Sequence, residues 1–139
     1  MLKLLRKRPL LLVLLLFGLV YLAYGYYLGH IVKSVTVSAF ESYKAVENNP
    51  YLDIISDENY NHLVKRQYHD FTLPNTYDKY FISPALVIHW FDGAIAYIRY
   101  NYEYFQNDEI NSGSMGVVVK FTLKLQDGQW KIVDIYEGP

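Results

Sequence analysis

Hydrophobic and polar residues alternate through residues 85–136, a pattern typical of β-hairpins. The expected strands and turns are, in order, Ala85–Phe91, Asp92-Gly93, a strand through Gln106, Met115–Gln126, Asp127-Gly128 and Gln129–Tyr136. Asp-Gly favours a two-residue type I′ turn, because both central residues of that turn need a positive φ. The alternation therefore predicts a four-strand antiparallel meander.

The two turns also set which side chains share a face of each hairpin. In the second hairpin this register places Asp134 opposite Phe121, and in the first it places His89 opposite Ala96. The apolar face of the second hairpin is expected to form the core, with Met115, Val117, Val119, Phe121, Leu123, Leu125, Trp130 and Ile132. A matching stripe on the long strand consists of Ala96, Ile98, Tyr100, Tyr102 and Tyr104.

Helical spacing replaces alternation before the hairpins. Apolar residues step by three and four along residues 31–49, which predicts a helix that ends before Pro50, with Val32, Val35, Ala39, Tyr43 and Val46 on one face. Ser56 is the expected N-cap of a second helix that reaches His69. Residues 70–84 are expected to be an irregular cover with a helical turn at 77–82, and residues 107–114 a polar loop. This order predicts an α+β fold: an N-terminal transmembrane helix, then two helices packed on a bent antiparallel four-strand meander.

The segment Leu10–Val32 contains no charged residue and is long enough to span a hydrocarbon core of roughly 30 Å. Basic residues precede it, which predicts a cytoplasmic tail at residues 1–9, a signal anchor at 10–32 and an extracytoplasmic domain at 33–139. Tyrosines at the far end would form an interfacial belt, namely Tyr21, Tyr24, Tyr26 and Tyr27. The alternative is a signal peptide that is cleaved near Gly25, which would release a secreted protein.

Composition narrows the class of partner. The 139 residues suit one domain, and the absence of cysteine excludes disulfides and thiol chemistry. Five of the 13 basic residues precede Ser34 and none of the 14 acidic residues does, so the rest of the chain is acidic. An acidic domain argues against nucleic-acid binding, because neutralising phosphates requires a basic face.

The closing stretch, residues 123–135 (LKLQDGQWKIVDI), resembles the terminal hairpin of the nuclear-transport-factor-2-like (cystatin-like α+β) superfamily. The resemblance implies helices in the concavity of a strongly bent sheet and covers the predicted domain almost completely. The family's first strand and third helix are reduced here to residues within 71–82. An anchor leading into such a domain also resembles the bitopic assembly factors of type IV secretion and conjugation machines, by layout alone.

Asp134 is the weak candidate for a catalytic residue. Burial on an apolar face would raise the pKa of its carboxyl group and suit it to act as a general base. The resemblance implies an acid or a histidine in a concave pocket, so a ligand site would comprise His89, Tyr100, Tyr102 and Asp134. The alternatives are that Asp134 is solvated or hydrogen-bonded to a tyrosine, and that His89 is an ordinary core residue.

No metal site or cofactor is expected, because His62 and His69 lack a third ligand and the chain has no Gly-rich phosphate loop. The predicted function is therefore a non-enzymatic, membrane-anchored protein-interaction or assembly module of the cell envelope. Its partners would be the bilayer, through residues 10–32, and another envelope protein or a second copy. The alternative is a small-molecule-binding domain or pocket enzyme that uses Asp134, for which a cavity of roughly 300 Å³ lined by Asp134 would be the sign.

Overall fold

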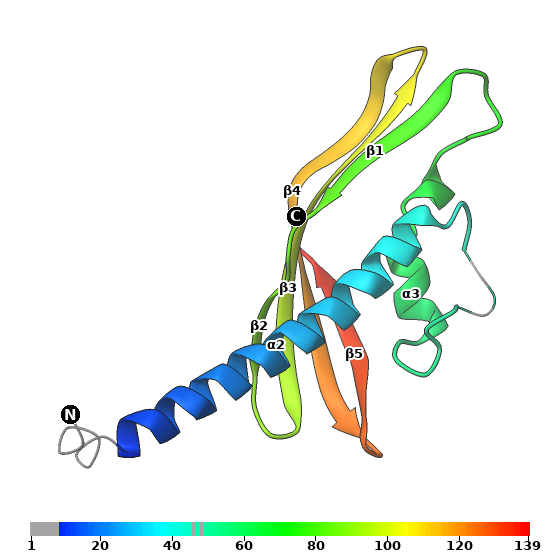
Figure 1. The fold of residues 1–139 in the computed structure, drawn as a ribbon. Helices are drawn as coiled ribbons and strands as arrows, with labels where there is room; N and C mark the ends of the chain where they lie inside the picture. Colours follow the sequence, from blue (N-terminus) through cyan, green and yellow to red (C-terminus); the bar gives the residue numbers. More distant parts are fainter. Residues whose placement is uncertain (1–8, 46, 48) are drawn as a thin grey trace.

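The computed structural model describes residues 9–45, 47 and 49–139 and confirms the α+β class (Figure 1). One long helix, α2 (Pro9–Glu41), crosses one face of an antiparallel sheet. The short helix α3 (Asp57–Leu63) and a 3₁₀ turn, η1 (Arg66–Tyr68), lie on the same side of the sheet as the end of α2. Residues 1–8 of the predicted tail, which spans residues 1–9, lie outside the described residues, as does Val46 of the predicted helix face.

The sheet has five strands in place of the four predicted. They are β1 (Thr76–Ile82), β2 (Leu86–His89), β3 (Gly93–Gln106), β4 (Glu109–Gln126) and β5 (Gln129–Glu137). Their order is β1-β3-β4-β5, and β2 pairs with the other half of the β3 edge that β1 occupies. The helical turn predicted at residues 77–82 is wrong, because this segment is strand β1. Ser83 bridges the gap before β2: its amide donates to the carbonyl of Arg99, and its hydroxyl accepts from the amide of Arg99.

The β4–β5 turn is the one that Asp-Gly predicted, since Asp127 and Gly128 have φ of 52° and 76°. The β2–β3 turn is displaced. The amide of Trp90 donates to the carbonyl of Gly93, so Phe91 and Asp92 form the turn and His89 pairs with Ala94 rather than Ala96. The Trp90 indole explains the displacement, because it lies across Gly93 where a Cβ would come within 2.6 Å of the ring.

The polar loop predicted at residues 107–114 is also wrong. Asn107 and Asp108 form a tight turn with φ of 52° and 63°, and β4 begins at Glu109. Figure 1 shows the β3–β4 hairpin as an arm beyond the helices, above the point where the sheet bends. Gly116, with φ of 66°, lies at the bulge where the register of β4 shifts opposite Asn101. Beyond that bulge Met115 is 75% exposed, so its predicted place in the core is wrong.

A second bulge changes the face of Asp134. Leu123 pairs with Ile132 as predicted, but Thr122 pairs with Asp134 and Phe121 with Ile135. The extra residue, Val133, shifts every following side chain of β5 to the opposite face. The predicted pairing of Asp134 with Phe121 is therefore wrong, and Asp134 is exposed.

The core lies between α2 and the inner face of the sheet. Leu28, Val32, Val35 and Phe40 of α2 are fully buried, and the predicted burial of Phe121 and Trp130 is confirmed. Helix α2 runs from the apolar segment into the core without interruption but ends at Glu41, before the predicted end at Asn49. Ser56 caps α3 as predicted, with its hydroxyl accepting from the amide of Asn59 at 3.3 Å.

Candidate functional site

The first half of α2 is an exposed apolar segment. Its large side chains from Leu10 to Tyr27 are between 39% and 78% exposed, whereas Leu28 is fully buried. By length and composition α2 is the one helix in the described part of the chain that could cross a membrane. An aliphatic surface of this size on all sides of a helix is stable only when lipid or protein covers it.

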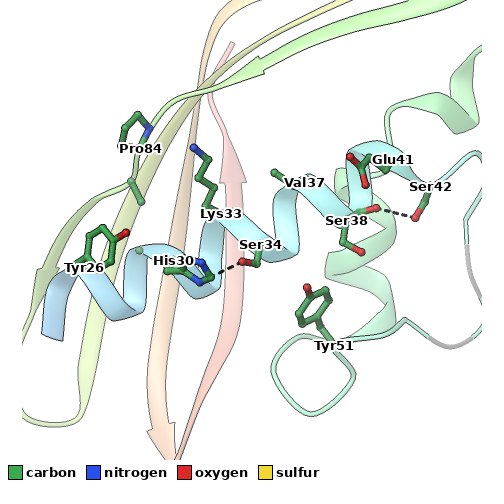
Figure 2. A pocket seen from close by; sticks show the side chains of 12 residues that line it. Tyr26, His30, Lys33, Ser34, Val37, Ser38, Glu41, Ser42, Tyr51 and Pro84 are labelled. Atoms are coloured by element: carbon green, nitrogen blue, oxygen red, sulfur yellow. Dashed lines mark hydrogen bonds between the residues drawn. The ribbon is translucent and has the colours of Figure 1, made fainter. Parts of the chain in front are cut away.

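A groove of about 860 Å³ follows the second half of the same helix. Figure 2 shows Tyr26, His30 and Lys33 along one side of α2 and Pro84, from the segment between β1 and β2, next to them. Further residues along the groove are Ser34, Val37, Ser38, Glu41, Ser42 and Tyr51. Ser34 and Ser38 lie four residues apart on the helix, and Ser42 follows its last residue. The hydroxyls of Ser38 and Ser42 lie 2.8 and 3.3 Å from the hydroxyl of Tyr60 on α3. The groove is open along its length and has few charges.

Two clusters of charged side chains lie between the inner face of the sheet and the helical segment formed by α3 and η1, residues 57–68. In the first, the ammonium group of Lys65 donates to both carboxylate oxygens of Glu137, at 2.8 and 2.9 Å. The hydroxyl of Tyr100 donates to the same carboxylate, and Nε2 of His62 lies 3.5 Å from it. Glu137 reaches this place because of the Val133 bulge, which turns it to the inner face opposite Val119.

In the second cluster, Arg66 binds Asp78 through two nitrogens at 2.5 and 2.8 Å. The hydroxyl of Tyr102 donates to the same carboxylate at 3.0 Å, and the third guanidinium nitrogen donates to the carbonyl of Glu41 at 2.9 Å. The Asp78 side chain is only 6% exposed. A planar guanidinium that binds a carboxylate through two nitrogens is a strong, orienting contact. It ties η1 to β1 and to the last turn of α2.

Burial and the adjacent carboxylates shift the pKa values of four side chains in and near these clusters. Burial raises the pKa of Tyr100, and its hydrogen bond to Glu137 raises that pKa further. The pKa of Tyr102 is raised by burial and by the charge of Asp78. The hydrogen bond to Asp78 raises the pKa of Arg66. Burial lowers the pKa of His69, whose ring stacks on Tyr104 with centroids 4.5 Å apart. At neutral pH the two phenols are therefore hydrogen-bond donors, the guanidinium of Arg66 is charged and His69 is neutral.

A smaller pocket of about 290 Å³ lies between these clusters. Its lining comprises Lys65, Tyr68, His69, Tyr100, Tyr102, Ser112, Gly113, Ser114 and Glu137. A general acid or base must exchange its proton with a substrate. Here each carboxylate is already bound to a cation and a tyrosine. The arrangement therefore stabilises the fold and can offer donors to a small polar ligand.

The predicted site residues do not come together. Tyr100 and Tyr102 line the small pocket, but Asp134 is on the outer face of the sheet. His89 lies against α2, where its Nε2 donates to the carbonyl of Tyr21 at 2.8 Å. His89 is only partly buried and lies against the exposed half of the helix, so it is not the ordinary core residue of the alternative. A ligand-binding role for these residues stays a prediction.

Sequence reasoning missed the residues that form the two clusters, Lys65, Arg66, Asp78 and Glu137. The basic pair falls in the last turn of the predicted second helix, and Asp78 in the helical turn predicted at residues 77–82. Residues 76–82 gave no clear signal, because each face of β1 mixes polar and apolar side chains instead of alternating between them. Among the described residues no group of three His, Asp or Glu side chains could hold a metal ion.

The comparisons with known proteins give no relative for this chain: no family model, no curated protein and no solved structure matches it.

Proposed function

We propose that the protein is a single-pass membrane protein whose domain lies outside the cytoplasm and binds another protein of the cell envelope. The observation that carries the proposal is the groove's position on the same unbroken helix as the exposed apolar segment. A chain anchored in this way presents the groove directly above the bilayer. The cationic residues before Pro9 support a cytoplasmic N-terminus.

The shape of the groove favours a segment of protein as its occupant. From Tyr26 to Ser42 it extends about 24 Å along the helix at 1.5 Å per residue. A small residue such as Ser34 lets a second backbone approach the helix closely. The two charges, on Lys33 and Glu41, lie about two turns apart and can each pair with an opposite charge on the partner. A compact ligand would fill only part of such a long open surface.

The charged clusters support binding rather than catalysis as the role of the domain. Their carboxylates are bound by Lys65 and Arg66 and hold the helical segment on the sheet. We also keep the nuclear-transport-factor-2-like assignment as a proposal. It is supported by helices on one face of an antiparallel sheet that bends near its middle (Figure 1).

Photo-crosslinking in intact cells tests this function. A benzophenone amino acid at His30, an exposed residue of the groove, should form an adduct of one defined mass. The matched control carries the same amino acid at Glu109, which is exposed on the arm and outside the groove. Ser34→Trp should fill the groove and abolish the adduct without changing the thermal unfolding of the domain.

Three results would contradict the proposal: no adduct from position 30, an adduct that persists in Ser34→Trp, or equal labelling from position 109. An adduct of twice the mass of the chain would identify the partner as a second copy. Protease added to spheroplasts tests the topology separately, because it should digest the domain without lysis. Full protection until lysis would show that the domain is cytoplasmic.

A further inference from the structure

The β2–β3 turn carries two exposed aromatic side chains beside the anchor. Phe91 is 93% exposed and Trp90 is 49% exposed. They continue an apolar stripe on the outer face of β2 that includes Leu86 and Ile88, which are 66% and 54% exposed. Exposed aromatic side chains at the tip of a turn can bind a surface without breaking any contact in the core. A water-exposed turn would normally carry polar residues.

Hydrogen bonds and packed aromatic rings hold this end of the sheet against α2. Nε2 of His89 donates to the carbonyl of Tyr21, and the two rings stack with centroids 4.0 Å apart. Nε1 of Trp130, on β5, donates to the hydroxyl of Tyr24 at 2.6 Å. Gly25 faces the same ring, and a Cβ there would be in ordinary van der Waals contact with it at 3.5 Å. The end of the sheet is therefore attached at the level of Tyr21–Tyr24.

That level falls within the apolar segment itself. Residues 9–27 extend about 28 Å along the helix at 1.5 Å per residue, close to the thickness of a hydrocarbon core. Tyr21 and Tyr24 lie about 9 and 5 Å inside its outer end by the same rise. A helix that crosses the bilayer with this segment brings the attached turn to the boundary between headgroups and acyl chains. Interfacial amphipathic elements insert to a similar depth, about 5–10 Å.

The charges near the turn fit an anionic surface. Lys124 and Lys131 lie directly opposite each other on β4 and β5, and Lys124 pairs in register with Gly93 next to the turn. Like charges in this position destabilise a sheet. In the described part of the chain neither lysine forms an ion pair, although Asp92 and Asp127 occupy the neighbouring turns. Lipid phosphates would neutralise both lysines.

We propose that the β2–β3 turn is a second membrane contact: Phe91 and Trp90 insert into the outer leaflet, and Lys124 and Lys131 bind anionic lipid headgroups. The inference rests on the proposed anchoring by α2. It fixes the orientation of the domain, because a helix and a turn together define how the sheet stands on the bilayer. The β3–β4 arm, at the other end of β3, then points away from the membrane.

The absence of cysteine allows one spin label to be placed at a time in the full chain. The chain is reconstituted in vesicles of phosphatidylcholine and phosphatidylglycerol at three to one, and each label's accessibility to oxygen and to a water-soluble nickel complex is measured. Asp92→Cys reports on the turn and leaves both aromatic residues in place. Glu109→Cys is the matched control on the arm, and Leu15→Cys reports on the anchor.

The label at position 92 should be more accessible to oxygen than to the nickel complex, as is expected for the label at position 15. The label at position 109 should be more accessible to the nickel complex. Phe91→Asp should make position 92 resemble position 109, with unchanged thermal unfolding because Phe91 is exposed. Lys124→Gln with Lys131→Gln should reduce the ratio of oxygen accessibility to nickel accessibility at position 92 in these vesicles, but not in vesicles of pure phosphatidylcholine. No effect of this pair would overturn the electrostatic part of the proposal.

Two outcomes separate this inference from the function on which it rests. If position 15 is in the bilayer but position 92 is as accessible to nickel as position 109, the turn is not a membrane contact and the anchor stands. If position 15 is also open to nickel, the anchor and the turn are both refuted.

Discussion

The two halves of α2 have the same backbone conformation and opposite surroundings. Residues 9–27 are apolar and exposed apart from the contacts of Tyr21 and Tyr24 with the sheet. Residues 28–41 bury one apolar face and present hydroxyls and charges on another. In water, burial of its apolar face holds the second half of the helix on the sheet. The first half remains uncovered, and its apolar surface is stable only when lipid or protein covers it. The change of environment at Tyr27–Leu28 therefore occurs within one unbroken helix, with Gly25 and Gly29 on either side of it.

The largest effect should come from charging the first half. Leu16→Arg with Leu19→Arg should cost membrane insertion about 6 kcal/mol, because each arginine near the centre of a span costs roughly 3 kcal/mol. Both leucines are 65% exposed, so the domain should keep its fold. Alkaline extraction of membranes measures the release. The matched control, Leu52→Arg with Leu73→Arg on the exposed surface of the domain, should stay with the membrane.

Truncating one phenylalanine in each half sharpens the contrast. Phe40 is fully buried against the rings of Tyr100 and Tyr102, so Phe40→Ala should destabilise the domain by about 3–5 kcal/mol. Phe17 is 70% exposed, and Phe17→Ala should change unfolding by less than about 0.5 kcal/mol. Thermal unfolding of the full chain in detergent micelles compares them. Equal effects would mean that the two halves are not distinct environments.

The second half is also held by charge. Asp78→Asn should cost about 3 kcal/mol, because it leaves the guanidinium of Arg66, which is only 14% exposed, without its ion-pair partner. The loss should extend to the end of α2, where Arg66 donates to the carbonyl of Glu41. Asp134→Asn is the matched control and should stay within about 0.5 kcal/mol, since Asp134 is exposed. A clear loss in Asp134→Asn would restore the face assignment that the bulge overturns.

The smallest effect concerns alkaline pH. The raised pKa values of Tyr100 and Tyr102 mean that the folded state holds these protons more tightly than the unfolded chain, whose tyrosine pKa is about 10. Their contribution is present below pH 10 and is lost as pH rises toward the folded-state values. Melting temperatures between pH 8 and 11 should fall less steeply in Tyr100→Phe with Tyr102→Phe. An identical slope in that variant would exclude the two phenols as the cause.

Local turn chemistry predicts one hairpin and misplaces the other for a physical reason. At Asp127-Gly128 the turn residues adopt the positive φ that the motif requires. At Asp92-Gly93 the packing of Trp90 on Gly93 takes precedence and moves the turn by one residue. The β3–β4 arm escaped notice because it extends beyond the helices, so its β4 strand needs no buried face and its sequence, Asn111 to Ser114, shows no alternation.

The candidate site was less predictable because bulges are not marked by a motif. The sequence placed Tyr100 and Tyr102 correctly on the inner face. The extra residue in β5, Val133, turns Asp134 to the outer face. Glu137, rather than Asp134, is therefore the carboxylate beside Tyr100. The groove on α2 depends on Pro84 and Tyr51, which come from segments without periodicity. Such contacts follow from the tertiary fold and could not be inferred from spacing alone.

The unbroken helix also sets the order in which the protein can mature. The hydrogen bond between Trp130 and Tyr24 joins residues 106 positions apart, and the core strands β3, β4 and β5 all follow the helix in the chain. During synthesis the apolar face of residues 28–41 therefore leaves the ribosome long before the sheet that covers it exists. Contacts of such long range form slowly. The nascent domain passes through a stage in which this face is open to chaperones, to proteases and to neighbouring copies.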